Sequence, residues 1–319
     1  WYGRSIVKCL ARVKTNQQPH AIANHGQTVA HFPPKAGLGA VGTTLQLGAP
    51  AQVAKVTGLT VIHNFRAGDL AAGGQGAPLV PLYHQQLIGP KRRRLGVAVH
   101  NVGGISNFSY FGPDGKVLGF DTGPGNFWMD LAAARFSDGT LRMDRDGKIA
   151  SRGSADPEGV RRVLRLPYFS VHPPKSTGRD AFPFRLLLSA TRARDADLVA
   201  TALEVTVESI ARAYERWVIG EGHPLKEIHL CGGGAKNKFF AKRLAERLEC
   251  HGISIFSVEK TFGIDPSLVE AQAFAYFGFR TLHGQTLSGV WTGARGFGPP
   301  AAITPGANWL ALLKRIGPL

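Results

Sequence analysis

The sequence Gly119-Phe120-Asp121-Thr122-Gly123-Pro124-Gly125-Asn126 joins an apolar run to a helical pattern through a turn rich in glycine and proline. The apolar run, residues 117–120, predicts a strand, with Asp121 at its end. Glycine allows positive φ angles and close approach of the backbone to a ligand, and proline stiffens the turn. An acid between a strand and a helix is favoured for chemistry in α/β proteins. Asp121 is therefore the first candidate catalytic residue, and a surface turn with a local Asx hydrogen bond is the alternative.

A phosphate clasp is predicted just before this stretch. Residues 95–120 predict three strands joined by turns, and the first turn contains Gly103, Gly104, Ser106 and Asn107. Two backbone amides and two polar side chains could together hold a phosphate group without a charged residue. The strand that ends at Asp121 is the third of the three.

A second glycine-rich loop, Cys231-Gly232-Gly233-Gly234-Ala235-Lys236-Asn237, lies between a predicted strand at 227–230 and a predicted helix at 239–248. In this arrangement a nucleotide can lie across glycine amides near the start of a helix. The spacing Gly-x-Gly-x-x-Gly is missing, which excludes a dinucleotide-binding fingerprint.

Two loops near the start of the chain offer polar side chains to a ligand. His25-Gly26-Gln27-Thr28 supplies an imidazole, an amide and a hydroxyl suited to a polyol, and a structural histidine is an equal alternative for His25. Arg66 and Asp69 follow a predicted strand at 59–63 and lead into a glycine-rich loop that could cradle an anion. An internal ion pair between Arg66 and Asp69 is the alternative.

Two further segments contain charged side chains. Residues 173–180 combine Lys175, Ser176, Thr177 and Arg179 in one short loop, a composition that suits anions. Glu270 lies in the first turn of a predicted helix at 267–283, where a carboxylate complements the helix dipole.

The charge of the chain is strongly positive. It has 38 Lys and Arg against 22 Asp and Glu, a net charge of +16, which would suit nucleic acid or another anionic partner. The basic residues are scattered, however, and the one tight run, residues 91–94, lies between apolar segments as a solvated loop would. A small anionic substrate explains the charge as well, so we expect no nucleic-acid partner.

The size and composition suit a soluble protein. At 319 residues with 44% hydrophobic residues, the chain can form two domains or one large α/β unit. The three cysteines include no C-x-x-C pair, which argues against a disulfide framework or a zinc site and fits a reducing compartment. No apolar run is long enough to cross a bilayer. We therefore expect a cytoplasmic protein with no membrane partner.

Taken together, the loops resemble those of the anhydro-N-acetylmuramic acid kinases, sugar kinases of the actin-like ATPase superfamily. The matching stretches occur in order over nearly the whole chain. They are HGQT (25–28), FRAGDLAAGGQGAPLVPLYH (65–84), NVGGISN (101–107), GFDTGPGNFWMD (119–130), PPKSTGRDAF (173–182), CGGGAKN (231–237), GIDPSLVEAQAFAYF (263–277) and VWTGARG (290–296).

The resemblance implies an α/β, actin-like (ribonuclease H-like) fold of two domains with a cleft between them. Residues 1–94 would be the remainder of domain I on the sugar side, 95–290 domain II, and 291–319 a tail that packs back on the body. The implied partners are ATP with Mg²⁺ and a small sugar, and a homodimer is a reasonable default.

The resemblance also implies an activity and roles for residues. The kinase would open the 1,6-anhydro ring of its sugar with water while O6 takes the γ-phosphoryl group of ATP, giving N-acetylmuramic acid 6-phosphate for cell-wall recycling. Asp121 would be the general base that activates the water. Residues 103–107 and 231–237 would be the second phosphate loop and the adenosine loop, with ligand contacts from Gly103, Gly104, Ser106, Asn107, Gly232, Gly233, Gly234 and Asn237. The sugar pocket would be lined by Gln27, Thr28, Arg66, Asn126 and Glu270, and the Mg²⁺ ligands are not identified.

The sequence departs from the family in two ways. Members begin with a Gly-Thr-Met-Ser-Gly-Thr-Ser-x-Asp-Gly phosphate loop on a β-hairpin, which this sequence lacks, so we expect the first hairpin of domain I to be missing and the 319-residue chain to have little or no activity by itself. The family's Asp-Phe-Arg-x-x-Asp appears here with Asn64 in place of its first acid. An inactive homologue that retains only sugar binding is therefore the alternative function.

Overall fold

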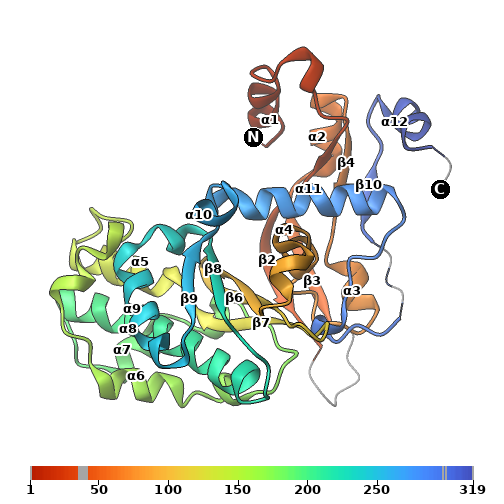
Figure 1. Ribbon diagram of the computed structural model, residues 1–319. Helices are drawn as coiled ribbons and strands as arrows, with labels where there is room; N and C mark the ends of the chain where they lie inside the picture. The colour runs from red at the N-terminus through yellow and green to blue at the C-terminus, as the bar shows by residue number, and fades with distance from the viewer. Residues whose placement is uncertain (1, 35–41, 297, 299, 318–319) are drawn as a thin grey trace. The chain divides into compact units, whose positions relative to one another are not determined.

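The computed structural model describes residues 2–34, 42–296, 298 and 300–317, which form two compact units (Figure 1). Unit 1 comprises Trp1–Tyr83 and Ala271–Leu319, and unit 2 comprises His84–Glu270. The sequence placed these boundaries at 94/95 and 290/291. The second boundary differs because helix α11 (Val269–Leu282) packs Ala273 and Phe277 into a core of unit 1.

Unit 2 is built on a five-stranded sheet with the order β7-β6-β5-β8-β9. Its first strand in sequence, β5, lies in the middle; β6 pairs antiparallel with β5, and β7 pairs antiparallel with β6. Strands β8 and β9 extend the sheet in the parallel direction on the other side of β5. This order and these directions are those of a ribonuclease H-like fold, so the α/β, actin-like fold class predicted from the sequence is confirmed. The strands are β5 (Val97–Val102), β6 (Ile105–Phe111), β7 (Val117–Pro124), β8 (Glu227–Cys231) and β9 (Ser254–Ser257).

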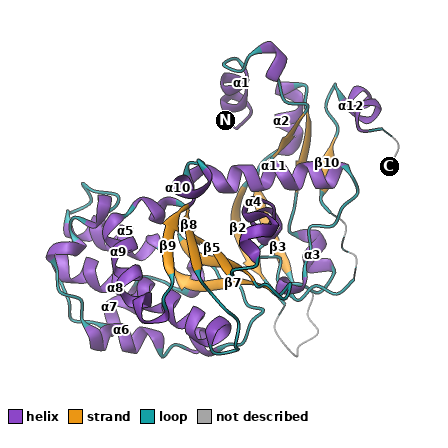
Figure 2. Cartoon of the chain, viewed as in Figure 1, coloured by secondary structure: helices purple, strands orange, loops and turns teal. Residues whose placement is uncertain are grey.

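One face of this sheet is covered by helices that form the larger core of the molecule (Figure 2). The central helix α8 contacts α5, α6, α9 and strand β7, and Tyr214 near its end packs against Phe108 and His100. A single π-helical turn, Glu215–Ile219, continues α8. The helices of unit 2 are α5 (Asn126–Phe136), α6 (Pro157–Leu164), α7 (Arg185–Ala190), α8 (Asp195–Tyr214), α9 (Lys238–Leu248) and α10 (Val258–Phe262).

Unit 1 contains a smaller sheet with the order β1-β4-β10, in which β1 is parallel and β10 antiparallel to β4. A separate hairpin, β2 with β3, projects from the loop that contains His25. The strands are β1 (Ala21–Ala23), β2 (Gln27–Phe32), β3 (Thr43–Leu47), β4 (Thr60–His63) and β10 (Ala302–Thr304), and the helices besides α11 are α1 (Tyr2–Leu10), α2 (Pro50–Thr57), α3 (Ala67–Ala71) and α12 (Trp309–Ile316).

Two local predictions were wrong. The basic run 91–94 is not a solvated loop, because residues 91–93 form the last turn of helix α4 (Pro81–Arg93), where positive charge complements the helix dipole and Arg92 pairs with Glu227 at 2.7 Å. Strand β7 does not end before Asp121 but continues to Pro124.

Among the described residues, no helix is both long and apolar enough to cross a membrane.

Candidate active site

Asp121 lies at a β-bulge. In the pairing of β6 with β7, Asn107 is opposite Asp121 and Ser106 is opposite Gly123, so Thr122 is an extra residue. Bulges bend a strand and redirect its side chains, and they are common beside active sites. Asp121 is buried, with 6% of its surface exposed.

A polar row crosses the sheet at the level of Asp121. The hydrogen-bond register pairs Asp121 with Asn107, Asn107 with Asn101, and Asn101 with Cys231. Residues that are directly opposite in a sheet share one face, so a carboxylate and two amides stand side by side on neighbouring strands. The opposite face carries Phe108 and Phe120, which pack in the core.

Glu270 extends this row. The amide of Asn101 donates a hydrogen bond to the Glu270 carboxylate at 3.1 Å. The Cys231 thiol is buried, and burial with the nearby Glu270 charge raises its pKa, so it stays protonated at neutral pH. Asn101 was not among the predicted site residues, although its place at the end of a buried strand was visible in the sequence.

The loop around Lys175 holds Asp121 in place. The Thr177 N–H donates to the Asp121 carboxylate at 2.8 Å, the Asp121 N–H donates to the Lys175 carbonyl at 3.4 Å, and the Tyr168 hydroxyl donates to the Asp121 carbonyl at 2.6 Å. The carboxylate and its backbone are thus fixed by a segment more than forty positions further along the chain. The sequence showed the polar composition of this loop but not its partner.

The two glycine loops meet at Asn126. Its backbone N–H donates to the Gly103 carbonyl at 2.7 Å and its side-chain amide to the Val102 carbonyl at 2.9 Å. A Cβ on Gly234 would lie 2.6 Å from the Asn126 side-chain oxygen, which shows how closely the second loop approaches. Asn126 therefore lies between the loops predicted to bind phosphate and adenosine.

An arginine lies over the first of these loops. A Cβ on Gly104 would fall 2.5 Å from the Arg179 guanidinium, which also lies over the Phe127 ring at 5.9 Å. The nearby Asp130 has its pKa raised to about 6 by burial, with Arg179 opposing the shift. Arg179 is exposed and adds a positive charge to an otherwise neutral loop.

Some predicted ligand residues are occupied by internal contacts. The Ser106 hydroxyl is fully buried between His100 Nε2 at 2.7 Å and the Thr122 hydroxyl at 2.8 Å. The Asn237 side-chain oxygen caps helix α9 by accepting from Phe240 N–H at 3.0 Å. By contrast, the N–H groups of Gly103 and Gly104 donate to no protein acceptor within the described part of the chain.

The other predicted sugar residues lie in unit 1. Gln27 and Thr28 begin strand β2, where Gln27 is exposed. Arg66 donates from Nε to His25 Nε2 at 3.1 Å and from Nη1 to the Gly76 carbonyl at 2.9 Å. Burial and the Arg66 charge lower the pKa of His25 to about 4, so the ring is neutral and accepts from the arginine.

The alternative for Arg66, an ion pair with Asp69, stays a prediction. The Asp69 carboxylate accepts from the Gly76 N–H and the Thr292 hydroxyl, each at 2.7 Å; burial raises its pKa, and the Arg66 charge opposes that shift. Asp69 thereby joins the glycine-rich loop to the segment around Thr292 and is a structural residue.

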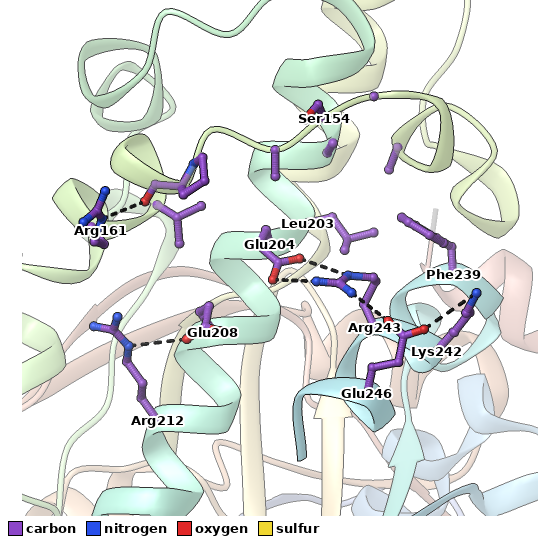
Figure 3. Close-up of a pocket in the computed structure, with 16 residues that line it drawn as sticks. Ser154, Arg161, Leu203, Glu204, Glu208, Arg212, Phe239, Lys242, Arg243 and Glu246 are labelled. Carbon is purple, nitrogen blue, oxygen red and sulfur yellow. Dashed lines mark hydrogen bonds and ion pairs between the residues drawn. The ribbon is translucent and has the colours of Figure 1, made fainter. Parts of the chain in front are cut away.

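A cavity of about 710 Å³ between α8, α9 and residues 150–161 contains none of the predicted site residues (Figure 3). Arg243 points to Glu204 and Glu246, at 3.2 and 2.6 Å. The other basic side chains of the cavity, Arg161, Arg212 and Lys242, also have carboxylate partners. Its charges are therefore balanced within the protein.

The described residues include no cluster of three or more His, Cys, Asp or Glu side chains that could hold a metal ion.

Comparison with known proteins identifies one family. The sequence model of the anhydro-N-acetylmuramic acid kinases matches residues 2–305. The anhydro-N-acetylmuramic acid kinase of Acidithiobacillus ferrooxidans is 39% identical over 98% of this chain and 79% of its own length. The kinase of the same name from Pseudomonas syringae pv. tomato is 40% identical over 89% of this chain and 75% of its own length.

Among solved structures, an activator of 2-hydroxyisocaproyl-CoA dehydratase from Clostridium difficile with bound ADPNP aligns with 57% of this chain and 59% of its own. Its TM-score of 0.34 and identity of 13% are too low to carry an argument. The sequence relatives are sufficient: the chain belongs to the anhydro-N-acetylmuramic acid kinase family.

Proposed function

We propose that this protein is an ATP-dependent kinase that opens 1,6-anhydro-N-acetylmuramic acid with water and phosphorylates O6 to give N-acetylmuramic acid 6-phosphate. Family membership supports the reaction. The observation that carries the assignment of the site is the buried, clamped Asp121 on the same sheet as two glycine loops.

Asp121 is the general base in this proposal. A glycosidase normally uses an acid and a base on opposite sides of the bond. In this reaction the departing O6 forms a bond to phosphorus, so no acid has to protonate it, and one base that removes a proton from the attacking water is sufficient. The Thr177 amide, which donates to the Asp121 carboxylate, would hold this base in one orientation.

The phosphates of ATP would lie along the glycine loops. The N–H groups of Gly103 and Gly104 would contact phosphate oxygens, and Gly232, Gly233 and Gly234 would lie under the adenosine. Arg179 would add charge to the first loop. The side chains of Ser106 and Asn237 support the loops from inside, which leaves Asn107 as the polar side chain of the first loop beside Asp121.

Magnesium would be held mainly by the phosphates, as is usual for this ion, with one or two carboxylates. Glu270 is the acid of the polar row besides the base Asp121, and its carboxylate has the chemistry that suits the ion. Bound Mg²⁺ would neutralise charge on the transferred phosphoryl group.

We propose that the residues which contact the sugar are Gln27, Thr28, Arg66, Asn126 and Glu270. The contacts of Asn126 with Val102 and Gly103 also give it the role of holding the glycine loops. We further propose that the enzyme acts in the cytoplasm, where ATP is available, and that it forms a homodimer.

The test is conversion of the anhydro sugar by the purified chain with ATP and Mg²⁺, followed by mass spectrometry of the 6-phosphate. Asp121→Asn should lower kcat by about 10²- to 10⁴-fold, the usual contribution of a general base. The control Asp180→Asn, an exposed acid of the neighbouring loop, should keep the rate.

Two results would count against the proposal. Wild-type turnover in Asp121→Asn would remove Asp121 as the base. A wild-type chain that binds the sugar yet forms no product would favour the inactive homologue.

A further inference from the structure

A second cavity in unit 2 lies behind the strand that carries Asp121. Its volume is about 370 Å³, and it lies between Thr122 of β7, the segment 164–175 and the end of α8. Its charged lining residues are Lys175, Arg212, Glu215 and Arg216, and Ser170 adds a hydroxyl. The Thr122 hydroxyl donates to Ser106, which lies on the face of the sheet opposite Asn107 and Asp121, so this cavity is distinct from the polar row.

Lys175 lines the cavity as a buried cation. Only 6% of its surface is exposed, and its ammonium donates to the Tyr168 carbonyl at 3.0 Å. It lies over the rings of Tyr168 and Phe120 at 4.6 and 5.3 Å. Lys175 forms no ion pair within the described residues, although the Asp121 charge acts on it, and burying a charge is costly. Burial, followed by the charge of Arg216, lowers the pKa of Lys175 to about 8, while Asp121 opposes the shift.

Arg216 brings a second positive charge to the rim. It lies over the Trp217 ring at 4.5 Å, and the part of the chain that the structure describes gives it no carboxylate partner. The one acid that lines the cavity, Glu215, already accepts from Arg247 at 2.7 Å and faces His251 at 3.0 Å. Arg212 is paired with Glu208 at 3.5 Å. Within the described residues Lys175 and Arg216 therefore form no ion pair, unlike the basic side chains of the cavity in Figure 3.

The backbone at this point is unusual. Arg216 and Trp217 belong to the π-helical turn that continues α8. Such turns are rare and often mark functional sites, because the extra residue redirects side chains. Here the turn supplies three of the lining residues, Glu215, Arg216 and Trp217.

We propose that this cavity is an anion site that binds a phosphate group, either free or as the monoester of a small sugar, between Lys175 and Arg216. Two cations and the hydroxyl of Ser170 suit an oxyanion with several acceptor oxygens. The volume of about 370 Å³ is many times the roughly 30 Å³ share of one water molecule, so a sugar ester can enter as well as free phosphate.

The site is joined to Asp121 through the backbone. The Lys175 carbonyl accepts from the Asp121 N–H, and Thr177 two residues further on donates to the Asp121 carboxylate. An anion that holds Lys175 would therefore stabilise the segment that orients the base. This effect on turnover rests on the proposed function, whereas the binding itself does not.

The test is isothermal titration calorimetry of the full chain, without ATP, using inorganic phosphate and, separately, glucose 6-phosphate. Arg216→Gln should weaken phosphate binding at least tenfold. Arg185→Gln, which removes one exposed charge elsewhere in unit 2, should leave it unchanged. Lys175→Met is the second variant and should also weaken binding, provided that its circular dichroism matches the wild type.

The two ligands separate the two sources of the phosphate group. Equal affinity identifies the phosphate alone as the ligand, and tighter binding of glucose 6-phosphate identifies a sugar ester. Phosphate that binds only to the glycine loops would be insensitive to Arg216→Gln, and this result would overturn the proposal. An absence of binding to the wild-type chain at millimolar phosphate would overturn it too, because the aromatic rings would then suffice to hold Lys175. Either result leaves the Asp121 assignment untouched.

Discussion

The hydroxyl of Ser106 lies in a buried hydrogen-bond chain that runs from Thr122 through Ser106 and His100 to Tyr214. Ser106→Ala would leave His100 Nε2 without its partner, and an unsatisfied buried group costs about 1–3 kcal/mol. We expect the free energy of unfolding to fall by that amount in urea titrations. The KM for ATP should change little, because the hydroxyl faces the protein interior.

The control for Ser106 is Ser151→Ala, which removes an exposed hydroxyl that contacts only the Lys148 carbonyl. It should leave both the free energy of unfolding and the KM nearly unchanged. A stable Ser106→Ala protein with a strongly raised KM for ATP would show instead that the hydroxyl contacts phosphate.

His25 makes unit 1 sensitive to acid. Its pKa is lowered from 6.5 to about 4, so between these values the folded state binds fewer protons than the unfolded state. Stability is therefore complete above pH 6.5 and falls as the pH drops toward 4. At pH 5 the loss from this one residue is up to about 2 kcal/mol.

The measurement is the free energy of unfolding at pH 7 and pH 5 for wild type and for His25→Gln. The variant should show a smaller difference between the two pH values, and the exposed His283→Gln should behave like wild type. An equal pH dependence in wild type and His25→Gln would contradict a neutral, half-buried His25.

At the scale of elements, the loop that we propose to bind adenosine, residues 231–237, depends on Gly232. Its φ is +77°, and an added Cβ would lie 2.3 Å from the Asn101 side-chain oxygen and 2.9 Å from the Val102 carbonyl. Gly222 has nearly the same φ, +79°, with nothing within 4 Å of its Cβ position. The two positions share a positive φ and differ in their surroundings.

Alanine at either glycine should cost about 1–2 kcal/mol through the positive φ. Gly232→Ala should cost a further 1–3 kcal/mol or so through overpacking, and it should weaken ATP binding because the loop must move. Urea titration and the KM for ATP measure the two effects. Equal losses in both variants would mean that the loop does not lie as tightly against Asn101 as described.

Local pattern was enough to predict most elements. The strands predicted at 59–63 and 227–230 and the helices predicted at 239–248 and 267–283 correspond to β4, β8, α9 and α11. The end of β7 was misplaced because Gly123 and Pro124 favour turns in isolation, whereas pairing with β6 holds them in the strand. Tertiary pairing overrode local preference at the very place where the catalytic candidate lies.

At the scale of the whole molecule, the two units differ in the size of their cores. In unit 2 all of β5 is buried between neighbours on both sides, whereas β1 and β10 of unit 1 are half-buried strands of three residues. Amide exchange is slowest where opening requires global unfolding. We therefore expect slow exchange in β5 and β8 and faster exchange in β1 and β10.

Hydrogen–deuterium exchange followed by mass spectrometry measures this difference peptide by peptide. The hairpin of β2 and β3, whose residues are exposed or half-buried, serves as a fast internal reference. Exchange in β1 as slow as that in β5 would contradict the expected order of exchange rates.

The candidate site was predictable only in part. Loop motifs indicated Asp121 and both glycine loops, since strand ends and glycine clusters are local features. The contacts that define the site are not local: Thr177 reaches Asp121 across 56 positions and Glu270 reaches Asn101 across 169. No periodicity in the sequence indicates such pairs. The hydrogen bonds that hold Asp121 and the polar row could therefore be found only from the structure.

The pairing of β6 with β7 also determines where this chain can change length. The turn between the two strands closes with Gly112 N–H donating to the Lys116 carbonyl at 2.9 Å, and its residues 113–115 are exposed. An insertion or a peptide tag at Asp114-Gly115 would lengthen the turn without changing which residues of β6 and β7 are paired. One extra residue inside β7 would instead rotate every side chain after it, directing the Asp121 carboxylate into the apolar layer against α8. Natural length variation in this hairpin should therefore be confined to its tip.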